Sequence, residues 1–524
     1  MSTTPQIPHL VLAGPEAWGH ARPLIFLAVR TVLTRDIDIT LFTTPRNHKR
    51  IVAELARGFD QSHADRQKLI RIVALDTTVE GVTGGFVETV KAEMQRYVGA
   101  FAEAYEQLLA GKPVTCHVSK HEFPAVAIPK VVVADVFLGQ LIPLIKKASP
   151  QVKFIGFCSG MTAFQYISFA PTSRGGRGDD KFKVLNVAKE TGRPLFEVAD
   201  EIFHEYTDEI MQIPGFPKMY HWELDAQEIA FISKGFLGGL KLSLFDTFGA
   251  CDGIILASPE PYEPEAVAAT RAWFAEDNRE TWALGPLLPS MATKEAIAGE
   301  EALSESFGQI KKFLDDAQTN YGDRSVLYIS FGSSFWPAKL EKLEAFVEVL
   351  VEKKIPFIFS HASPLAKVTD SLKATAEQSG LGLLTRWAPQ QTLLSHPALG
   401  WFVTHAGENS VLEAISAEVP MICWPFISDQ PLNAVNLTEI HDVAYELLEV
   451  RTGNGLKPIY RKGKGPINTV DALKAEARDV LEKAFSEDGE RKRRNLKALK
   501  AKLDGAWEKG GVAHGDLERL LSIV

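Results

Sequence analysis

The stretch Trp387–Gln430, WAPQQTLLSHPALGWFVTHAGENSVLEAISAEVPMICWPFISDQ, contains a strand, a polar turn and a helix in direct succession. Its apolar run Trp401–Thr404 has the composition of a buried strand, and it leads through His405-Ala-Gly-Glu-Asn-Ser into a helical pattern. A strand that passes through a glycine-bearing turn into a helix is the building unit of an α/β domain. The N–H groups and the dipole at such a helix start favour a bound phosphate.

Strands of the same kind recur through the chain and alternate with helical patterns. In the first half we predict strands at His9–Ala13, Ile37–Thr43, Ile70–Leu75, Lys130–Val136, Phe154–Phe157 and Gly253–Ala257. In the second half we predict Val326–Phe331, Phe357–Ser360, Gly382–Arg386, Gly400–Thr404, Met421–Trp424 and Ala444–Leu448. Many are continuous apolar runs, which suits parallel strands covered on both faces. Two such series predict an α/β protein with two doubly wound, Rossmann-like parallel-sheet domains.

The pattern also predicts where the domains divide. We expect residues 1–280 to form one domain, residues 281–490 a second domain, and residues 491–524 helices that pack back toward the first domain. Three polar stretches have no strand character: Ser290–Ser306 is predicted to be an exposed linker, Thr172–Asp180 a mobile loop, and the basic run Arg491–Arg494 a solvated helix face.

Composition narrows the class of protein. The chain has 524 residues, of which 45% are hydrophobic and 23% charged, which is typical of globular domains. Its net charge of −9 argues against a nucleic-acid partner. The four cysteines stand singly, which predicts neither a zinc site nor a disulfide framework. The first residues lack an apolar signal core, and no apolar run is long enough for a bilayer. We therefore expect a cytoplasmic monomer without an integral membrane segment.

The turn after the strand Trp401–Thr404 carries a set of candidate ligand-binding residues. Gly407 lets the backbone approach a ligand, and Asn409 and Ser410 either cap the helix or donate to an anion. His405 adds a donor on the same side. Glu413 lies about one helical turn after Asn409, so its carboxylate could accept two vicinal hydroxyls. Asp429 and Gln430 follow the next predicted strand, where a polyol could bind.

The first predicted strand ends in AGPEAWGHARP, residues 13–23, which does not match a G-x-G-x-x-G dinucleotide fingerprint. His20 lies on the turn at its carboxyl end, and Asp135, in VVVADVF, ends another predicted parallel strand. The two side chains could meet at one sheet edge. A buried carboxylate would then fix the tautomer of the imidazole and stabilise its protonated form, so His20 is a candidate general base.

The stretch Trp387–Gln430 resembles the nucleotide-sugar signature of the family-1 UDP-glycosyltransferases of the plant secondary-product type. The resemblance lies in the spaced pattern W-x-P-Q, H-x-G-x-N-S, E, P and D-Q. The resemblance implies a GT-B fold, in which two Rossmann-like domains face each other across a cleft. It also implies that the enzyme binds a UDP-sugar and needs neither a metal nor a cofactor. No D-x-D motif follows a predicted strand to hold a metal ion.

The resemblance assigns roles to individual residues. Trp387 would stack on uracil while the backbone of Ala388 pairs with its edge, and Gln390 and Glu413 would hold the ribose. The diphosphate would contact His405, Asn409, Ser410 and the backbone near Gly407. Asp429 and Gln430 would bind the transferred sugar, and the glutamine implies glucose.

Weaker likenesses lie outside this stretch. SVLYISFGSS, residues 325–334, makes Ser333 a further phosphate contact. The family's catalytic dyad matches His20 and Asp135, and Gly19 before the histidine belongs to the donor site. Cys158 stands where the family often has a threonine near the sugar, with Ser159 beside it.

One position departs from the family pattern. Glu408 replaces an aromatic residue, and a carboxylate beside a pyrophosphate is unfavourable unless it points away. Glu408 is therefore expected to face the sugar or the acceptor, or else to face solvent.

The expected reaction is an inverting transfer of a sugar to a hydroxyl of a small lipophilic or phenolic acceptor, giving a β-glycoside. Val79–Val90 and Phe164–Tyr220 are candidate acceptor walls, although core packing explains their aromatic residues equally well. Two alternatives remain open at this point: a UDP-sugar epimerase of the same fold, and a non-catalytic UDP-sugar-binding protein.

Overall fold

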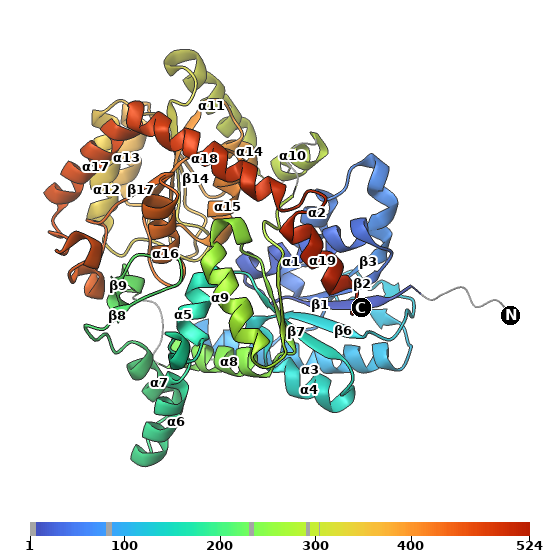
Figure 1. The fold of residues 1–524 in the computed structure, drawn as a ribbon. Coiled ribbons are helices and arrows are strands. Elements are labelled where there is room, and N and C mark those ends of the chain that lie inside the picture. The colour runs from blue at the N-terminus through green and yellow to red at the C-terminus, as the bar shows by residue number, and fades with distance from the viewer. Residues whose placement is uncertain (1–6, 80–85, 230–234, 290–293, 303) are drawn as a thin grey trace. The chain divides into compact units, whose positions relative to one another are not determined.

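The computed structural model describes residues 7–79, 86–229, 235–289, 294–302 and 304–524. These residues form two compact α/β units. Unit 1 comprises Met1–Glu205, Phe231–Ala296 and Ala506–Val524, and unit 2 comprises Tyr206–Ala230 and Ile297–Gly505. Each unit contains a parallel sheet with helices on both faces, as Figure 1 shows. The predicted fold class is therefore confirmed.

The sheet of unit 1 has seven parallel strands in the order β11-β10-β7-β6-β1-β2-β3. Their bounds are β1 His9–Ala13, β2 Asp38–Thr43, β3 Ile70–Ala74, β6 Val131–Asp135, β7 Lys153–Cys158, β10 Gly253–Leu256 and β11 Glu280–Ala283. Six of these match predicted strands to within a residue or so. Sequence analysis missed β11, because its sequence ETWA is short and begins with a charged residue. β1 and β6 are neighbours, and Ala13 pairs with Ala134.

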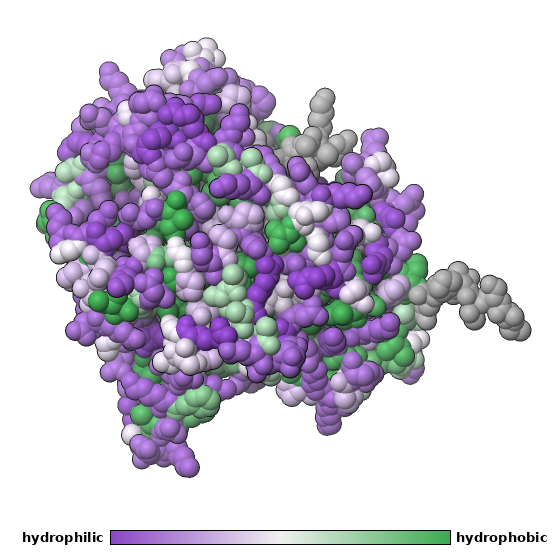
Figure 2. All heavy atoms as spheres, in the orientation of Figure 1, coloured by the Kyte–Doolittle hydropathy of each residue, from purple (hydrophilic) through white to green (hydrophobic). Residues whose placement is uncertain are grey.

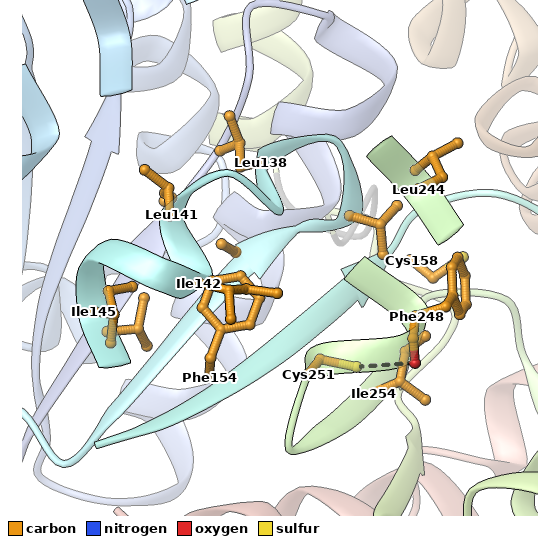
Figure 3. Close-up of a cluster of buried hydrophobic side chains, with 14 of the residues drawn as sticks. Leu138, Leu141, Ile142, Ile145, Phe154, Cys158, Leu244, Phe248, Cys251 and Ile254 are labelled. Carbon is orange, nitrogen blue, oxygen red and sulfur yellow. Dashed lines mark hydrogen bonds between the residues drawn. The ribbon is translucent and has the colours of Figure 1, made fainter. Parts of the chain in front are cut away.

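Both faces of this sheet are covered. On one face Val11 and Val132 belong to a core formed with α3 (Phe86–Leu109), α4 (Leu141–Ala148), α5 (Thr162–Phe169) and α8 (Phe236–Ala250). Part of this core, including Leu141, Phe154 and Phe248, is drawn in Figure 3. On the other face Leu10 and Val131 pack with α1 (Trp18–Thr34), α2 (Pro45–Ala56) and α19 (Val512–Leu521). Alternate residues thus enter two cores, which explains the continuous apolar runs.

Unit 1 is completed by further short elements. They are β4 (Val114–Thr115), β5 (Glu122–Phe123), α6 (Asp180–Thr191), α7 (Leu195–Phe203) and α9 (Pro264–Ala275). The helix α10 (Lys294–Glu301) spans the point where the chain passes from unit 1 into unit 2.

The sheet of unit 2 has six parallel strands in the order β14-β13-β12-β15-β16-β17. Their bounds are β12 Val326–Ser330, β13 Phe357–Ser360, β14 Gly382–Thr385, β15 Leu399–Thr404, β16 Met421–Cys423 and β17 Ala444–Glu446. All six were predicted. The helices are α11 (Phe307–Tyr321), α12 (Leu340–Glu352), α13 (Asp370–Ser379), α14 (Gln390–Leu394), α15 (Glu408–Ser416), α16 (Gln430–Val435), α17 (Val470–Ala484) and α18 (Glu487–Gly505).

Unit 2 also contains a segment from the first half of the chain. Residues 206–229, which we call the inserted segment, carry β8 (Ile210–Met211), β9 (Met219–Tyr220) and a turn of 3-10 helix at His221–Leu224. In Figure 1 the β8–β9 hairpin lies beside α16, and residues of the 3-10 turn contact α16. The hydrophobic patterning of the sequence did not indicate this association.

Three local predictions need correction. The predicted linker at 290–306 contains α10, and its Glu300 is buried rather than exposed. The stretch at 172–180 forms a compact turn instead of an open loop. It contains a 3-10 helix at Thr172–Arg174, and the backbone N–H of Gly178 donates to the Ala170 carbonyl. The basic run in α18 is solvated only in part: Arg491 and Arg494 are exposed, but Lys492 is buried and bonds Asp442 at 2.7 Å.

The molecular surface agrees with this division between core and exterior. Hydrophilic residues dominate the face drawn in Figure 2, and hydrophobic residues appear there only in small groups. Among the helices of the described residues, none is both long enough and apolar enough to cross a membrane.

Candidate active site

The structure brings His20 and Asp135 together at the carboxyl edge of the sheet in unit 1. Asp135 is the last residue of β6, and His20 lies in the first turn of α1, which follows the neighbouring strand β1. The Nδ1 atom of His20 lies 2.9 Å from Oδ2 of Asp135. The aspartate is fully buried, whereas the histidine is 26% exposed. The carboxylate therefore fixes the proton on Nδ1 and leaves Nε2 as the basic nitrogen.

Two further residues hold the imidazole, and sequence analysis did not assign either of them. Oγ of Ser159 lies 2.9 Å from Nδ1 of His20, and the ring of Phe137 stacks on the imidazole at 4.2 Å. The backbone N–H of Phe137 also donates to Oδ1 of Asp135 at 3.0 Å. The available signal was positional, because Ser159 directly follows β7 and Phe137 lies two residues after the end of the adjacent strand β6.

The helix α15 begins where the sequence predicted an anion-binding turn. Gly407 is its N-cap residue, and Asn409 and Ser410 lie in its first turn. Ala406 adopts a left-handed conformation with φ of 62°, which turns the chain from β15 into the helix. The first turn of a helix presents backbone N–H groups without intrahelical acceptors. The geometry thus suits a diphosphate at this end of α15.

His405 occupies a narrow slot between two glycines. A Cβ atom on Gly332 would lie 2.8 Å from its Cε1 atom, and one on Gly407 would lie 2.5 Å from its Nε2 atom. Gly332 follows β12, so the next residue, the exposed Ser333, lies at the same edge of the sheet as His405. Burial lowers the pKa of His405 to about 4. In the unliganded protein His405 is therefore neutral at pH 7, and its ring can serve a phosphate as a hydrogen-bond donor.

The residues that the resemblance assigned to the ribose form one cluster. Nε2 of Gln390 donates to Oε2 of Glu413 at 2.6 Å and to Oγ of Ser410 at 3.2 Å. The indole-bearing Trp387 is half-buried, and Ala388 is buried beside it. The carboxylate of Glu413 is thus oriented by Gln390.

Asp429 and Gln430 lie at the start of α16, which follows β16. The Gln430 side chain is buried, and its Oε1 accepts a hydrogen bond from the Phe426 backbone N–H at 3.0 Å. Asp429 is half-buried as the N-cap residue of α16. Because the oxygen of Gln430 is used by the backbone, its amide nitrogen is the group that can donate to a sugar hydroxyl.

Glu408 does not face solvent. Only 5% of the residue is exposed, and its Oε2 accepts a hydrogen bond from Nδ2 of Asn433 at 3.1 Å. Asn433 belongs to α16 and is fully buried. The solvent-facing alternative is therefore wrong, and Glu408 links the start of α15 to α16.

The remaining candidates are less informative. Gly19 is half-buried in the first turn of α1, and Cys158 is buried at the end of β7. Of the expected acceptor wall at 79–90, residues 80–85 lie outside the described residues. In the second wall, aromatic residues including Tyr166, Phe169 and Phe203 belong to the hydrophobic core of unit 1.

Comparison with known proteins identifies relatives of this chain. Residues 256–452 match the family described as UDP-glucoronosyl and UDP-glucosyl transferase. UDP-glycosyltransferase eriJ of Hericium erinaceus is 31% identical over 98% of this chain and 98% of its own length. Mogroside I-A1 synthase of Siraitia grosvenorii is 25% identical over 84% of this chain and 77% of its own.

Solved structures show the same fold. The structure of Phytolacca americana UGT2 complexed with UDP-2fluoro-glucose and pterostilbene superimposes with a TM-score of 0.67 at 19% identity, covering 98% of this chain and 99% of that one. A UGT transferase from Siraitia grosvenorii in complex with UDP gives 0.65 at 18% identity, with the same coverage. The chain therefore belongs to the family-1 UDP-glycosyltransferases, which have the GT-B fold. It is an enzyme that transfers a sugar from a UDP-sugar to a small molecule.

Proposed function

We propose that the enzyme transfers glucose from UDP-glucose to a hydroxyl of a small lipophilic or phenolic acceptor, with inversion to a β-glycoside. The observation that carries this proposal is the contact of 2.9 Å between His20 and the fully buried Asp135. Such a pair activates a hydroxyl, which a transferase needs. A protein that only binds the donor does not need it, and an epimerase requires acid and base groups at the sugar instead.

The proposed mechanism is a single displacement. Nε2 of His20 takes the proton from the acceptor hydroxyl as its oxygen attacks the anomeric carbon. The imidazolium that forms is stabilised by Asp135, which accepts the hydrogen bond from Nδ1. Ser159 and Phe137 hold the ring in one orientation, so less freedom is lost when the acceptor binds.

The leaving group is UDP, which departs from the face opposite the acceptor. Its developing charge would be stabilised by the N–H groups at the start of α15 and by a hydrogen bond from the neutral His405. These fixed dipoles need no reorganisation during the reaction. We therefore propose that neither a metal ion nor a cofactor takes part.

The identity of the donor and acceptor rests on similarity. The Phytolacca americana relative was solved with a fluorinated UDP-glucose and with pterostilbene. Gln430, whose amide nitrogen is available to a sugar hydroxyl, supports glucose as the transferred sugar. The matched family and the relative eriJ are both described as transferases. They therefore give no support to the two alternative functions, a UDP-sugar epimerase and a non-catalytic UDP-sugar-binding protein.

A screen of UDP-sugars against mixed small acceptors, read by mass spectrometry, tests the proposal. We expect a glycoside from UDP-glucose and a phenol, and we expect His20→Ala to lower the rate by roughly 10²–10⁴-fold. His63→Ala is the matched control, because that histidine is exposed and bonds only its local turn. An epimerised donor, or binding without turnover, would contradict the proposal. A His20→Ala variant that kept most of its activity would refute the base assignment.

A further inference from the structure

The inserted segment, residues 206–229, is anchored firmly to unit 2. The indole N–H of Trp222 donates to the Pro458 carbonyl at 2.8 Å. The buried carboxylate of Glu223 accepts from the Tyr460 backbone N–H at 2.9 Å and from Nη1 of Arg461 at 3.1 Å. A buried ion pair in a fixed geometry specifies one arrangement, since the buried carboxylate of Glu223 would lose its compensating charge without Arg461.

The end of the inserted segment runs between two loops of unit 2. Thr452 donates its backbone N–H to the Ala226 carbonyl at 3.0 Å, and its hydroxyl accepts from the Glu228 N–H at 2.8 Å. Two glycines make room for this approach. A Cβ on Gly453 would lie 2.3 Å from Cγ of Glu228, and one on Gly455 would lie 2.3 Å from the Ala226 oxygen. The inserted segment and the loop after β17 are therefore fitted closely to each other.

Gln227 faces the other loop, which connects β16 to α16. Its backbone N–H donates to the Phe426 carbonyl at 3.0 Å, and its side-chain Nε2 donates to the Pro425 carbonyl at 2.8 Å. Gln227 is itself only 3% exposed. One residue of the inserted segment thus satisfies two successive buried carbonyls of the loop, which fixes the orientation of both peptide units.

The same loop holds Gln430 from the other side. The N–H of Phe426 donates to Oε1 of Gln430, so the Pro425–Phe426 peptide unit is bonded at its carbonyl by the Gln227 side chain and at its N–H by Gln430. Rotation of the Pro425–Phe426 region would release the Gln430 oxygen and turn its amide. The orientation of the Gln430 amide therefore depends on Gln227.

We propose that Gln227 is a positioning residue for recognition of the donor sugar, acting through the loop 425–429 on Asp429 and Gln430. This inference rests on the proposed function, in which those two residues bind the sugar hydroxyls. It assigns to the first half of the chain a part in sugar selectivity, because Gln227 bonds the loop that leads to Asp429 and Gln430.

The test separates recognition of the sugar from recognition of UDP. Gln227→Met keeps the length and volume of the side chain but removes the amide that bonds Pro425. We expect the KM for UDP-glucose to rise about tenfold, and the preference for UDP-glucose over UDP-galactose to fall by a similar factor. The inhibition constant of UDP, which lacks the sugar, should change less than twofold.

Gln212→Ala is the matched control, since Gln212 lies in the same inserted segment and its amide donates to the Phe216 carbonyl within that segment. It should leave all three constants unchanged. Gln227→Asn is the second variant if the methionine variant does not fold, because its shorter amide keeps the polarity but does not reach Pro425.

The outcomes are distinguishable. Unchanged constants in Gln227→Met would overturn the inference, and so would an equal rise in the KM for UDP-glucose and the inhibition constant of UDP, which would mark a purely structural role. Wild-type protein that binds UDP but forms no glycoside would instead refute the proposed function.

Discussion

At the scale of single residues, the histidine at the sheet edge depends on partners from two other segments. Asp135 and Phe137 come from the end of β6, Ser159 from the turn after β7, and His20 from the start of α1. A lone imidazole on a turn would exchange between tautomers and orientations. The buried carboxylate and the stacked ring remove that freedom, so Nε2 is held in place for the proposed role as the base.

Glu408 is a second residue whose role follows from its contact and not from its position beside the predicted phosphate site. We expect Glu408→Ala to destabilise unit 2 by about 1 kcal/mol or more, because the buried Asn433 amide loses an acceptor. Glu408→Gln should lose less, since its amide oxygen can still accept from Asn433. Urea unfolding followed by fluorescence measures both. Equal losses in the two variants would show that the negative charge, not the hydrogen bond, matters.

At the scale of elements, a short helix that carries the proposed ribose-binding residue Gln390 is held by the stretch that joins the two units. Glu300, in α10, accepts from the backbone N–H of Gln391 at 3.2 Å and from that of Thr392 at 2.7 Å. Its carboxylate thus caps the start of α14, whose first residue is Gln390. The stretch predicted to be a linker is therefore part of the framework around the ribose cluster.

Replacement of this cap tests the connection. In Glu300→Gln only one oxygen remains as an acceptor for the start of α14, so we expect the KM for UDP-glucose and the inhibition constant of UDP to rise together, by about 3- to 10-fold. The matched control is Glu301→Gln, in the same helix and half-buried. A rise in the KM alone would contradict this account, because the ribose belongs to both ligands.

At the scale of the whole molecule, buried ionisable groups make stability depend on pH in two opposite ways. Burial raises the pKa of Glu263 and of Glu476 to about 7. These folded-state values lie above the ordinary 4.5, so the folded protein holds protons that the unfolded chain releases. Their contribution to the free energy of unfolding is fully present below pH 4.5 and is lost as the pH rises to about 7. Burial lowers the pKa of His9 to about 3, which has the opposite sign and destabilises the fold in acid.

Glu263 offers the sharpest test, since it accepts from the backbone N–H groups of Thr162 and Ala163 at the start of α5. We expect the stability of the wild type relative to Glu263→Gln to fall between pH 5 and pH 7, by up to about 1.4 kcal/mol per pH unit. Urea midpoints of both proteins across that range measure the difference. A constant or rising difference would contradict the raised pKa. Glu260→Gln, at a partly exposed carboxylate nearby in the chain, is the control.

Much of the fold could be predicted because a strand that is buried on both faces appears in the sequence as a continuous run of apolar residues. The runs His9–Ala13 and Phe357–Ser360 match β1 and β13 at both ends. β11 was missed because its sequence ETWA is too short and too polar to form such an apolar run. The helix α10 was missed because its polar residues resemble those of a linker. The meeting of His20 with Asp135 was predictable, since β1 and β6 are parallel, so the turn after β1 that leads to His20 lies at the same sheet edge as Asp135, the last residue of β6.

By itself, the sequence determined the two series of parallel strands, the donor-binding signature and the pair of polar residues at adjacent strand ends. All of these depend on composition and spacing along a short stretch of chain. Only the tertiary structure decided that Ser159 contacts His20, that Glu408 points to Asn433, and that Gln227 supports the loop 425–429. The physical reason is that each of these contacts joins positions 25 to 198 residues apart. Their geometry is set by how separately formed elements pack, which no local pattern records.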